Sequence, residues 1–335
     1  MTTLSTTPAN ATSSAAAPRT TMTALTRNST KLPRAVATLL LAAVAIGCGP
    51  TFDPASLIEK TRVVGARVEV DGAPDRASPA PGETATVTWL VTSPAEIPAL
   101  GWAFALCAPS ALGDLNCDSA PLELYQGTDT PPRVTIAVPG ADALGTARTL
   151  TLYGRICVSS APTFDPESGY PACTDGGDGT TAAVSIALQD GTDANHNPVA
   201  DHAFTFDGQP WAANAGGDAC MAGLRVKAGT EEHAITILAE GSDRESYTAL
   251  SGYPPVPTAL RETLEISEFT TSGKLKTGVS FVEAADSAAQ TMVPVKWTTP
   301  KPADVTTEKP VTFTFVVRDG RGGIDWTTRS VCVTP

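Results

Sequence analysis

Apolar and polar residues alternate with a period of two along much of the chain. From Thr84 to Val91, Thr residues occupy one face while Ala, Val and Trp occupy the other, just after the turn Pro81-Gly82. This period is typical of a half-buried antiparallel strand. It recurs in Trp102–Leu106, Val134–Val138, Thr149–Val158 and Val184–Leu188. Short strands separated by Pro and Gly turns, without a convincing amphipathic helix, predict a β-sandwich.

The strongest strand signal of the second half lies at its end. Apolar residues alternate with Thr from Val311 to Val317, and the turn Arg318–Gly323 is rich in residues that accept a positive φ. The chain then returns through Ile324 to Val333, so we expect a long hairpin that closes a second sandwich. Further strands are expected at Leu224–Val226, Ile235–Ile237, Leu264–Ile266 and Val293–Trp297.

A polar, turn-rich stretch from Gln189 to Pro198 separates the two sets of strands. Such a composition is typical of a segment that links domains, and we place the boundary near residue 205. The 288 residues after position 47 exceed one small sandwich and suit two domains of ordinary size. The pattern therefore predicts an all-β protein with two tandem sandwiches, residues 62–205 and residues 206–335.

The first 47 residues have the composition of a secretory signal peptide. They contain no Asp or Glu, and their basic residues precede an uncharged run from Ala35 to Gly47 that is rich in Leu and Ala. The basic residues are Arg19, Arg27, Lys31 and Arg34. A membrane-spanning helix is the alternative, but this run would cover only about 20 Å of a hydrocarbon core of roughly 30 Å. Residues 1–21 are a low-complexity Thr/Ala/Ser stretch, so Met22 is an alternative start that gives a signal of ordinary length.

The end of the apolar run, Ala45-Ile46-Gly47-Cys48, resembles the lipobox of bacterial lipoproteins. The family prefers Leu at the position of Ala45. The resemblance implies that Cys48 is acylated and becomes the mature N-terminus, where several acyl chains form a stable membrane anchor. Because Gly49 rather than Asp follows the cysteine, it also implies delivery to the outer membrane. Residues 48–61 are then expected to form the lipidated cysteine and a tether.

Removal of the leader makes the remaining chain strongly acidic. It has 19 Lys and Arg against 35 Asp and Glu, a net charge of −16, because the leader holds four basic residues and no acidic ones. An acidic surface repels phosphate backbones and anionic headgroups. We therefore exclude nucleic-acid partners, and we expect membrane association only through the N-terminal lipid.

Six cysteines remain besides Cys48, an even number that indicates disulfides in an exported chain. They are Cys107, Cys117, Cys157, Cys173, Cys220 and Cys332. A zinc site is disfavoured because no pair has the usual C-x₂₋₄-C spacing. Six cysteines allow 15 connectivities, of which we favour the nearest-neighbour pairs, two within the first sandwich and one within the second.

The final hairpin with its R-D-G-R-G-G turn is similar to the last two strands of bacterial Ig-like and PKD-like extracellular domains. The opening of the first half, Arg67-Val68-Glu69-Val70 followed by a strand after Pro81-Gly82-Glu83, is similar to the same superfamily. The resemblance covers about half of the chain after the leader. It implies a fold rather than an activity, since such sandwiches serve as spacers, adhesion modules and carbohydrate-binding platforms.

Two polar loops are candidate metal sites. Hard oxygen donors cluster at the joint between the predicted domains and suit Ca²⁺, although the same residue types form ordinary turns. They are Asp190, Asp193, Asn195 and Asn197. A second acidic loop lies around Cys173 and contains Asp165, Glu167, Asp175 and Asp178.

The histidines and tryptophans allow further hypotheses. His196, Asp201 and His202 could bind a transition metal, but we favour two exposed histidines in a polar loop, and we expect His233 at the surface. Four tryptophans occupy inward strand positions and are expected in the cores: Trp89, Trp102, Trp297 and Trp326. Trp211, which lies in the linker, is expected to pack at the hinge rather than to stack on a sugar.

No familiar catalytic motif occurs in the sequence, neither G-x-S-x-G nor H-E-x-x-H nor a P-loop. Oxidation of the six cysteines would also remove a thiol nucleophile. We therefore expect no enzymatic activity and no cofactor apart from the candidate calcium. The favoured function is a lipid-anchored surface or periplasmic binding module for a protein or glycan. The alternative is a secreted carbohydrate-active or proteolytic accessory enzyme with paired loop carboxylates.

Overall fold

The computed structural model describes residues 54–108, 117, 120–165, 169–174, 177, 179–189, 194–214 and 219–335. Within them the chain is almost entirely β, which confirms the predicted fold class. The two α-helices there, α2 (Ala141–Leu144) and α3 (Ala219–Ala222), have four residues each. None of the helices in these ranges has the length and apolar character needed to cross a membrane.

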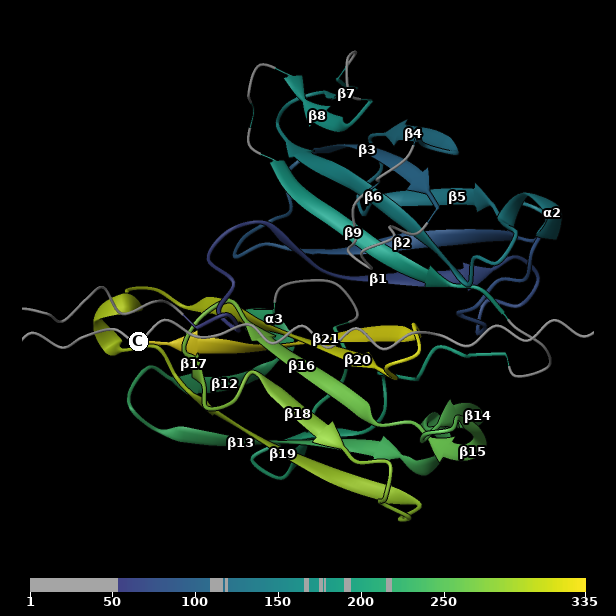
Figure 1. The fold of residues 1–335 in the computed structure, drawn as a ribbon. Helices are drawn as coiled ribbons and strands as arrows, with labels where there is room; N and C mark the ends of the chain where they lie inside the picture. The colour runs from purple at the N-terminus through teal and green to yellow at the C-terminus, as the bar shows by residue number, and fades with distance from the viewer. Residues whose placement is uncertain are drawn as a thin grey trace, which may run out of the picture. The chain divides into compact units, whose positions relative to one another are not determined.

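The N-terminal sandwich consists of two antiparallel sheets and a small hairpin (Figure 1). The strands of the sheets are β1 (Arg62–Val70), β2 (Thr84–Thr92), β3 (Leu100–Cys107), β4 (Glu123–Gly127), β5 (Arg133–Ala137), β6 (Thr149–Val158) and β9 (Gly179–Ala187). They are ordered β1-β2-β5 in one sheet and β4-β3-β6-β9 in the other, with the hairpin β7 (Pro162–Phe164) and β8 (Pro171–Cys173) beside them. Inward side chains of both sheets share one core, in which Trp89 stacks on Phe104 with ring centroids 5.0 Å apart.

The C-terminal sandwich consists of two five-stranded sheets. Its strands are β10 (Phe204–Phe206), β11 (Gln209–Pro210), β12 (Leu224–Lys227), β13 (Glu232–Glu240), β16 (Leu264–Thr270), β17 (Lys274–Leu275), β18 (Val279–Val282), β19 (Gln290–Thr298), β20 (Lys309–Arg318) and β21 (Ile324–Thr334). The orders are β11-β10-β13-β19-β17 and β12-β21-β20-β16-β18. Two short 3₁₀ turns, η2 (Gly241–Asp243) and η3 (Pro302–Asp304), lie in its loops. The core between the sheets is aromatic, with Trp297 packed edge-on against Phe313 at 5.0 Å.

Every segment with the period-two pattern lies largely in a strand, and β6 has the bounds that the pattern predicts. The final hairpin pairs Arg318 with Ile324 across its turn. In that turn Gly320 and Gly322 have positive φ, and the Asp319 carboxylate accepts hydrogen bonds from the backbone of Arg321 and Gly323. The Asp-Gly-rich turn thus forms for the expected conformational reason.

A separate two-stranded hairpin extends from the C-terminal sandwich. Its strands β14 (Ser246–Ser251) and β15 (Val256–Arg261) pair only with each other among the described strands. The sequence pattern did not predict this hairpin.

A packed joint connects the two sandwiches. Leu90, Val316 and Ile324 form a buried apolar cluster with residues from both. Beside it, the Asn197 side chain donates to the carbonyl of Val68 at 2.7 Å and accepts from the Ile324 N–H at 3.0 Å. Residues Asp53–Pro335 form one compact unit, so the predicted domain boundary near residue 205 stays a prediction.

The described part of the predicted tether is not a free linker. Leu57 forms a parallel bridge with Thr270 at the end of β16, and the Ile58 N–H donates to the Thr270 carbonyl at 2.8 Å. Ile58 is also buried. The chain is therefore fixed on the C-terminal sandwich before it begins β1.

The six cysteines form the three disulfides that the sequence analysis favours. They are Cys107–Cys117, Cys157–Cys173 and Cys220–Cys332, with sequence separations of 10, 16 and 112 residues. The first two close local loops of the N-terminal sandwich, and the third joins α3 to β21.

Candidate functional site

The described part of the candidate calcium loop faces the protein. Asn195 and Asn197 are buried, and the Asn195 side chain donates to Asp319 at 2.9 Å. Asn197 uses both ends of its amide across the joint, so its oxygen already has a protein donor. Asp190 and Asp193 lie outside the described residues, and calcium binding by the full set stays a prediction.

The structure does not bring His196, Asp201 and His202 together. His196 pairs with Glu245, His202 pairs with Asp243 at 2.6 Å, and Asp201 accepts a hydrogen bond from Arg329 at 2.6 Å. That bond is the main cause that lowers the pKa of Asp201. The three residues have separate partners, so they form no shared metal site. The sequence pattern predicted that His202 is exposed, but its side chain is only 17% exposed.

The remaining predicted sites are only partly described. Cys48, Glu167, Asp175 and Asp178 lie outside the described residues. In the ranges that the structure covers, the only group of His, Cys, Asp and Glu with metal-binding spacing is Cys220, Glu308 and Cys332. Its two cysteines are bonded to each other, which removes the thiolate ligands.

Two aromatic expectations are corrected. Trp211 does not pack at a hinge, because it lies buried in the C-terminal core against Phe206 and Phe313. Its indole N–H donates to the Ser330 carbonyl at 3.0 Å. His233 is buried rather than exposed, and it stacks on Phe206 at 5.1 Å while pairing with Asp207. Trp89, Trp102 and Trp297 are core residues as expected, whereas Trp326 is half-buried beside the joint cluster.

A cluster of charged residues lies beside the joint. The Arg321 guanidinium donates to Glu262 at 2.9 Å and to Glu245 at 3.3 Å, and it covers the ring of Tyr247 at 4.5 Å. Burial raises the pKa of Glu262 to about 7. A glycosidase would need two carboxyl groups that reach a substrate, but the Glu262 side chain is 1% exposed and Arg321 bridges the pair. The arrangement therefore stabilises the loops rather than offering a reactive pair.

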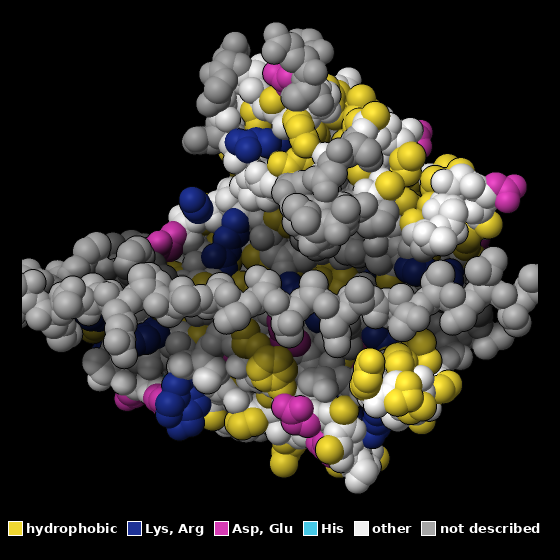
Figure 2. Space-filling model, viewed as in Figure 1, with side chains coloured by type: hydrophobic (Ala, Val, Ile, Leu, Met, Phe, Trp, Pro, Cys, Tyr) yellow, Lys and Arg dark blue, Asp and Glu magenta, His cyan; other side chains and the backbone are white. Residues whose placement is uncertain are grey.

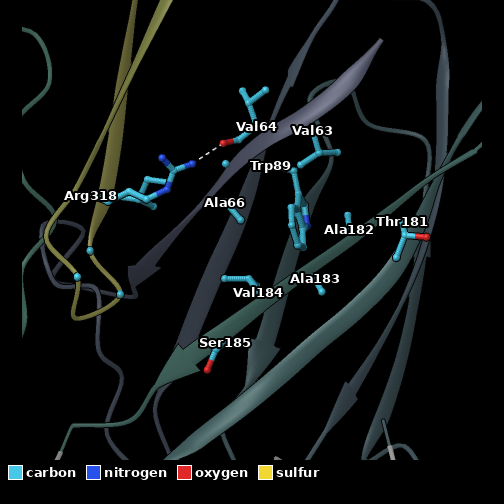
Figure 3. Close-up of a pocket in the computed structure, with 15 residues that line it drawn as sticks. Val63, Val64, Ala66, Trp89, Thr181, Ala182, Ala183, Val184, Ser185 and Arg318 are labelled. Carbon is cyan, nitrogen blue, oxygen red and sulfur yellow. Dashed lines mark hydrogen bonds between the residues drawn. The ribbon is translucent and has the colours of Figure 1, made fainter. Parts of the chain in front are cut away.

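A groove of about 500 Å³ lies between β1, β9 and the β20–β21 turn (Figure 3). Trp89, Ala66 and Val184 are among its apolar walls, and Arg318 carries the only formal charge among its described lining residues. Arg318 donates to the Val64 carbonyl at 2.7 Å and to Ser267 at 2.7 Å. The volume suits a ligand, and the described lining residues include no Asp, Glu, His or Cys.

The β14–β15 hairpin carries several exposed apolar side chains, among them the most exposed one of the described residues. Tyr253 at its tip is 101% exposed, Leu250 is 71% exposed and Val256 is 51% exposed. Figure 2 shows hydrophobic side chains gathered over this hairpin. Residues 246–261 contain a single charged residue, Arg261, in an acidic chain. A contiguous apolar surface of this kind is typical of an interaction site.

Sequence reasoning missed this surface because neither strand alternates in hydrophobicity toward a core. Two signals were present: the uncharged stretch 246–260, and the turn Gly252-Tyr253-Pro254-Pro255. No residue of either strand is fully buried, so no face requires the apolar pattern with a period of two that marks half-buried strands.

Comparison with known proteins adds no family assignment. No protein-family model matches the chain, and no curated protein matches it. The function must therefore be inferred from the residues and their geometry.

Proposed function

We propose that this chain is a lipid-anchored, non-catalytic binding module that contacts a partner protein through the β14–β15 hairpin. The observation that carries the proposal is the exposure of Tyr253, Leu250 and Val256 on a hairpin that pairs with no other described strand. Aromatic and aliphatic side chains that insert into a partner's pocket supply most of the energy of many interfaces. The anchor is the Cys48 lipid that the lipobox resemblance implies, at the outer membrane.

The position of the hairpin suits a membrane-anchored module. β15 ends at Arg261, just before β16 begins at Leu264, while Leu57 of the predicted tether contacts Thr270 at the opposite end of β16. A seven-residue strand is about 24 Å long at 3.4 Å per residue. The hairpin therefore lies at the end of β16 opposite the end that Leu57 and Ile58 contact, where a partner can reach it.

The surroundings of the hairpin define the partner's chemistry. Its base lies beside acidic residues of the neighbouring loops, namely Glu240, Asp243, Glu245, Glu262, Glu283 and Asp286. Only Arg244, Arg261 and Arg321 oppose them there. Charge complementarity favours a partner protein with an apolar pocket and a rim of Lys or Arg.

No feature of the described residues specifically favours the alternative function, a carbohydrate-active or proteolytic enzyme. It needs carboxylates that converge on an open cleft, and the close pair Glu245 and Glu262 is bridged by Arg321.

A recovery experiment tests the hairpin. The full chain is cross-linked in intact membranes, and its partners are compared for wild type, L250S/Y253S and the control L122S/L124S. The control replaces two other exposed apolar residues, Leu122 and Leu124 of the N-terminal sandwich, which are 51% and 46% exposed. We expect the hairpin variant to lose a partner that wild type and control retain. Identical partners for all three proteins, or none for wild type, would overturn the assignment.

The anchor is tested separately. Cys48→Ala is expected to abolish fatty-acid labelling and to release the protein from the membrane. A Cys48→Ala protein that is still labelled and membrane-bound would show that the anchor assignment is wrong, whatever the hairpin binds.

A further inference from the structure

β9 is an unprotected sheet edge. It lies last in the order β4-β3-β6-β9, spans nine residues, and contains no charged residue and no Pro. Natural proteins usually shorten, charge or cover such an edge, because its free N–H and C=O groups can pair with another strand. β9 is therefore neither short nor charged, and it contains no Pro that would prevent pairing.

The other sheet edges of the described sandwiches are protected. β4, β5, β11, β12, β17 and β18 have five residues or fewer. β1 has nine residues, but Arg318 and Asn197 cover it by donating to the carbonyls of Val64 and Val68, each at 2.7 Å. Arg155 donates to the Gly179 carbonyl at 3.5 Å at the start of β9, so the open part of this long edge is the stretch from Thr181 to Ser185.

The hydrogen-bond pattern identifies the free groups of β9. The N–H of Leu188 donates to Arg148, whose position continues the β6–β9 register. Backbone groups alternate between the two sides of an antiparallel strand, so Ala182, Val184 and Ile186 face β6. Thr181, Ala183 and Ser185 then direct their N–H and C=O groups to the open side, and no hydrogen bond between described residues uses those groups.

The groove beside this edge provides room for side chains. Gly65 and Ala66 of β1 and Ala182 and Ala183 of β9 line it, and their small size leaves the volume of about 500 Å³ next to Trp89. Figure 3 shows Thr181 to Ser185 along one wall, with Val63, Val64, Ala66 and Trp89 on the other. An added strand would bond to the β9 backbone and place alternate side chains over these walls.

We propose that β9 and the adjoining groove bind an extended peptide segment of a partner protein, which joins the sheet as an additional strand. The groove has no Asp or Glu in its described lining, and Arg318, which also pairs with Glu265 at 3.5 Å, lies at one side. The segment therefore has apolar residues at alternate positions and a carboxylate that approaches the groove side of Arg318. A second copy of this chain fits less well, because two acidic chains with formal net charge −12 repel each other. The inference does not depend on the hairpin or on the anchor.

Selection from random 12-residue peptides displayed on phage, against the purified full-length chain, tests the proposal. We expect enriched peptides with alternating apolar residues and an acidic residue. A synthetic copy of an enriched peptide is expected to protect the amides of Thr181, Ala183 and Ser185 from hydrogen exchange.

A variant tests the same edge. Ala183→Pro removes one outward N–H and no bond to β6, and it is expected to weaken peptide binding at least ten-fold. The matched control Ala183→Thr keeps the N–H and is expected to bind like wild type.

A second measurement covers the case in which Ala183→Pro does not fold. Peptides N-methylated at single positions are bound to the wild-type chain, and only every second methyl group is expected to abolish binding, because only alternate N–H groups face β9. Loss at consecutive positions, protection of other strands, or no enriched peptide would overturn the proposal. So would reversible dimerisation of wild type that Ala183→Pro prevents, since the occupant would then be a second copy.

Discussion

At the scale of single residues, the least exposed carboxyl group among the described residues lies on β16. Glu268 is 0% exposed, and its carboxyl oxygens accept hydrogen bonds from Ser280 at 2.6 Å and Thr277 at 3.2 Å. Burial disfavours the charged form and raises its pKa to about 7, against the opposing effect of the two hydroxyl groups. The folded chain therefore binds this proton more tightly than the unfolded chain, whose pKa is near 4.5.

The Glu268 carboxyl predicts a pH-dependent stability. Its contribution is fully present below pH 4.5 and is lost as the pH rises through about 7. Glu268→Gln cannot ionise, so we expect it to raise the free energy of unfolding at pH 8 by up to about 3 kcal/mol and to flatten its decline between pH 5 and 8. Urea denaturation across that range measures the effect. The exposed Glu231→Gln is the control, and a Glu268→Gln profile parallel to wild type would contradict the assignment.

Asn197 is the residue whose amide spans the joint. Asn197→Ala leaves the Val68 carbonyl and the Ile324 N–H without their partners. Each unsatisfied buried group costs about 1–3 kcal/mol, so we expect a loss of about 2–5 kcal/mol in the free energy of unfolding. Asn214→Ala removes an exposed amide that bonds to Ser330 and is expected to cost less than about 1 kcal/mol. Equal losses in the two variants would show that the joint bonds add little.

At the scale of elements, the hydrophobic pattern predicts the strands that bury one face and misses the strands that bury little of either face. β2, β6 and β20 alternate because one face meets a core, and each was predicted within one or two residues. The hairpin β14–β15 and the edge strand β18 bury little, so their hydrophobicity carries no period. The candidate surfaces escaped prediction for the same reason, since the exposure of Tyr253 depends on what does not pack against it.

The linker shows a second limit of local sequence. Its Asp and Asn residues indicate a turn or a metal loop, yet Asn195 and Asn197 lie buried and bond to residues more than 120 positions away, namely Asp319 and Ile324. Composition cannot identify such partners, because an Asn in a solvated turn and an Asn that bonds across the joint have the same local sequence context. The disulfide pairing was predicted correctly because each of the six cysteines bonds to the cysteine next to it in sequence order.

Cys220–Cys332 is expected to stabilise the chain more than Cys157–Cys173. In the chain-entropy description the stabilisation grows with the closed loop, and the separations are 112 and 16 residues. We expect C220A/C332A to lose about 4–5 kcal/mol and C157A/C173A about 3 kcal/mol. Guanidinium denaturation of the two double variants under non-reducing conditions compares them. A larger loss for C157A/C173A would mean that effects within the native fold outweigh loop entropy.

At the scale of the whole molecule, the joint determines whether the sandwiches act independently. Two domains joined by a flexible linker would unfold separately. Here the buried cluster of Leu90, Val316 and Ile324 and the Asn197 bonds connect them. A rigid joint also holds the groove, because β1 and the β20–β21 turn line it from different sandwiches.

We therefore expect residues 54–335 to unfold in one cooperative transition by calorimetry. Gly65 is the position at which this coupling can be broken, because a Cβ there would lie 2.9 Å from the Ile324 side chain and 3.6 Å from Val316. Gly65→Val adds still more bulk, so the joint must open, and we expect two transitions in place of one. Gly140→Val is the matched control, since no atom lies within 4 Å of a Cβ at that position. Two transitions already in the wild-type chain would show that the joint does not couple the sandwiches, and the groove would then have a wall that moves.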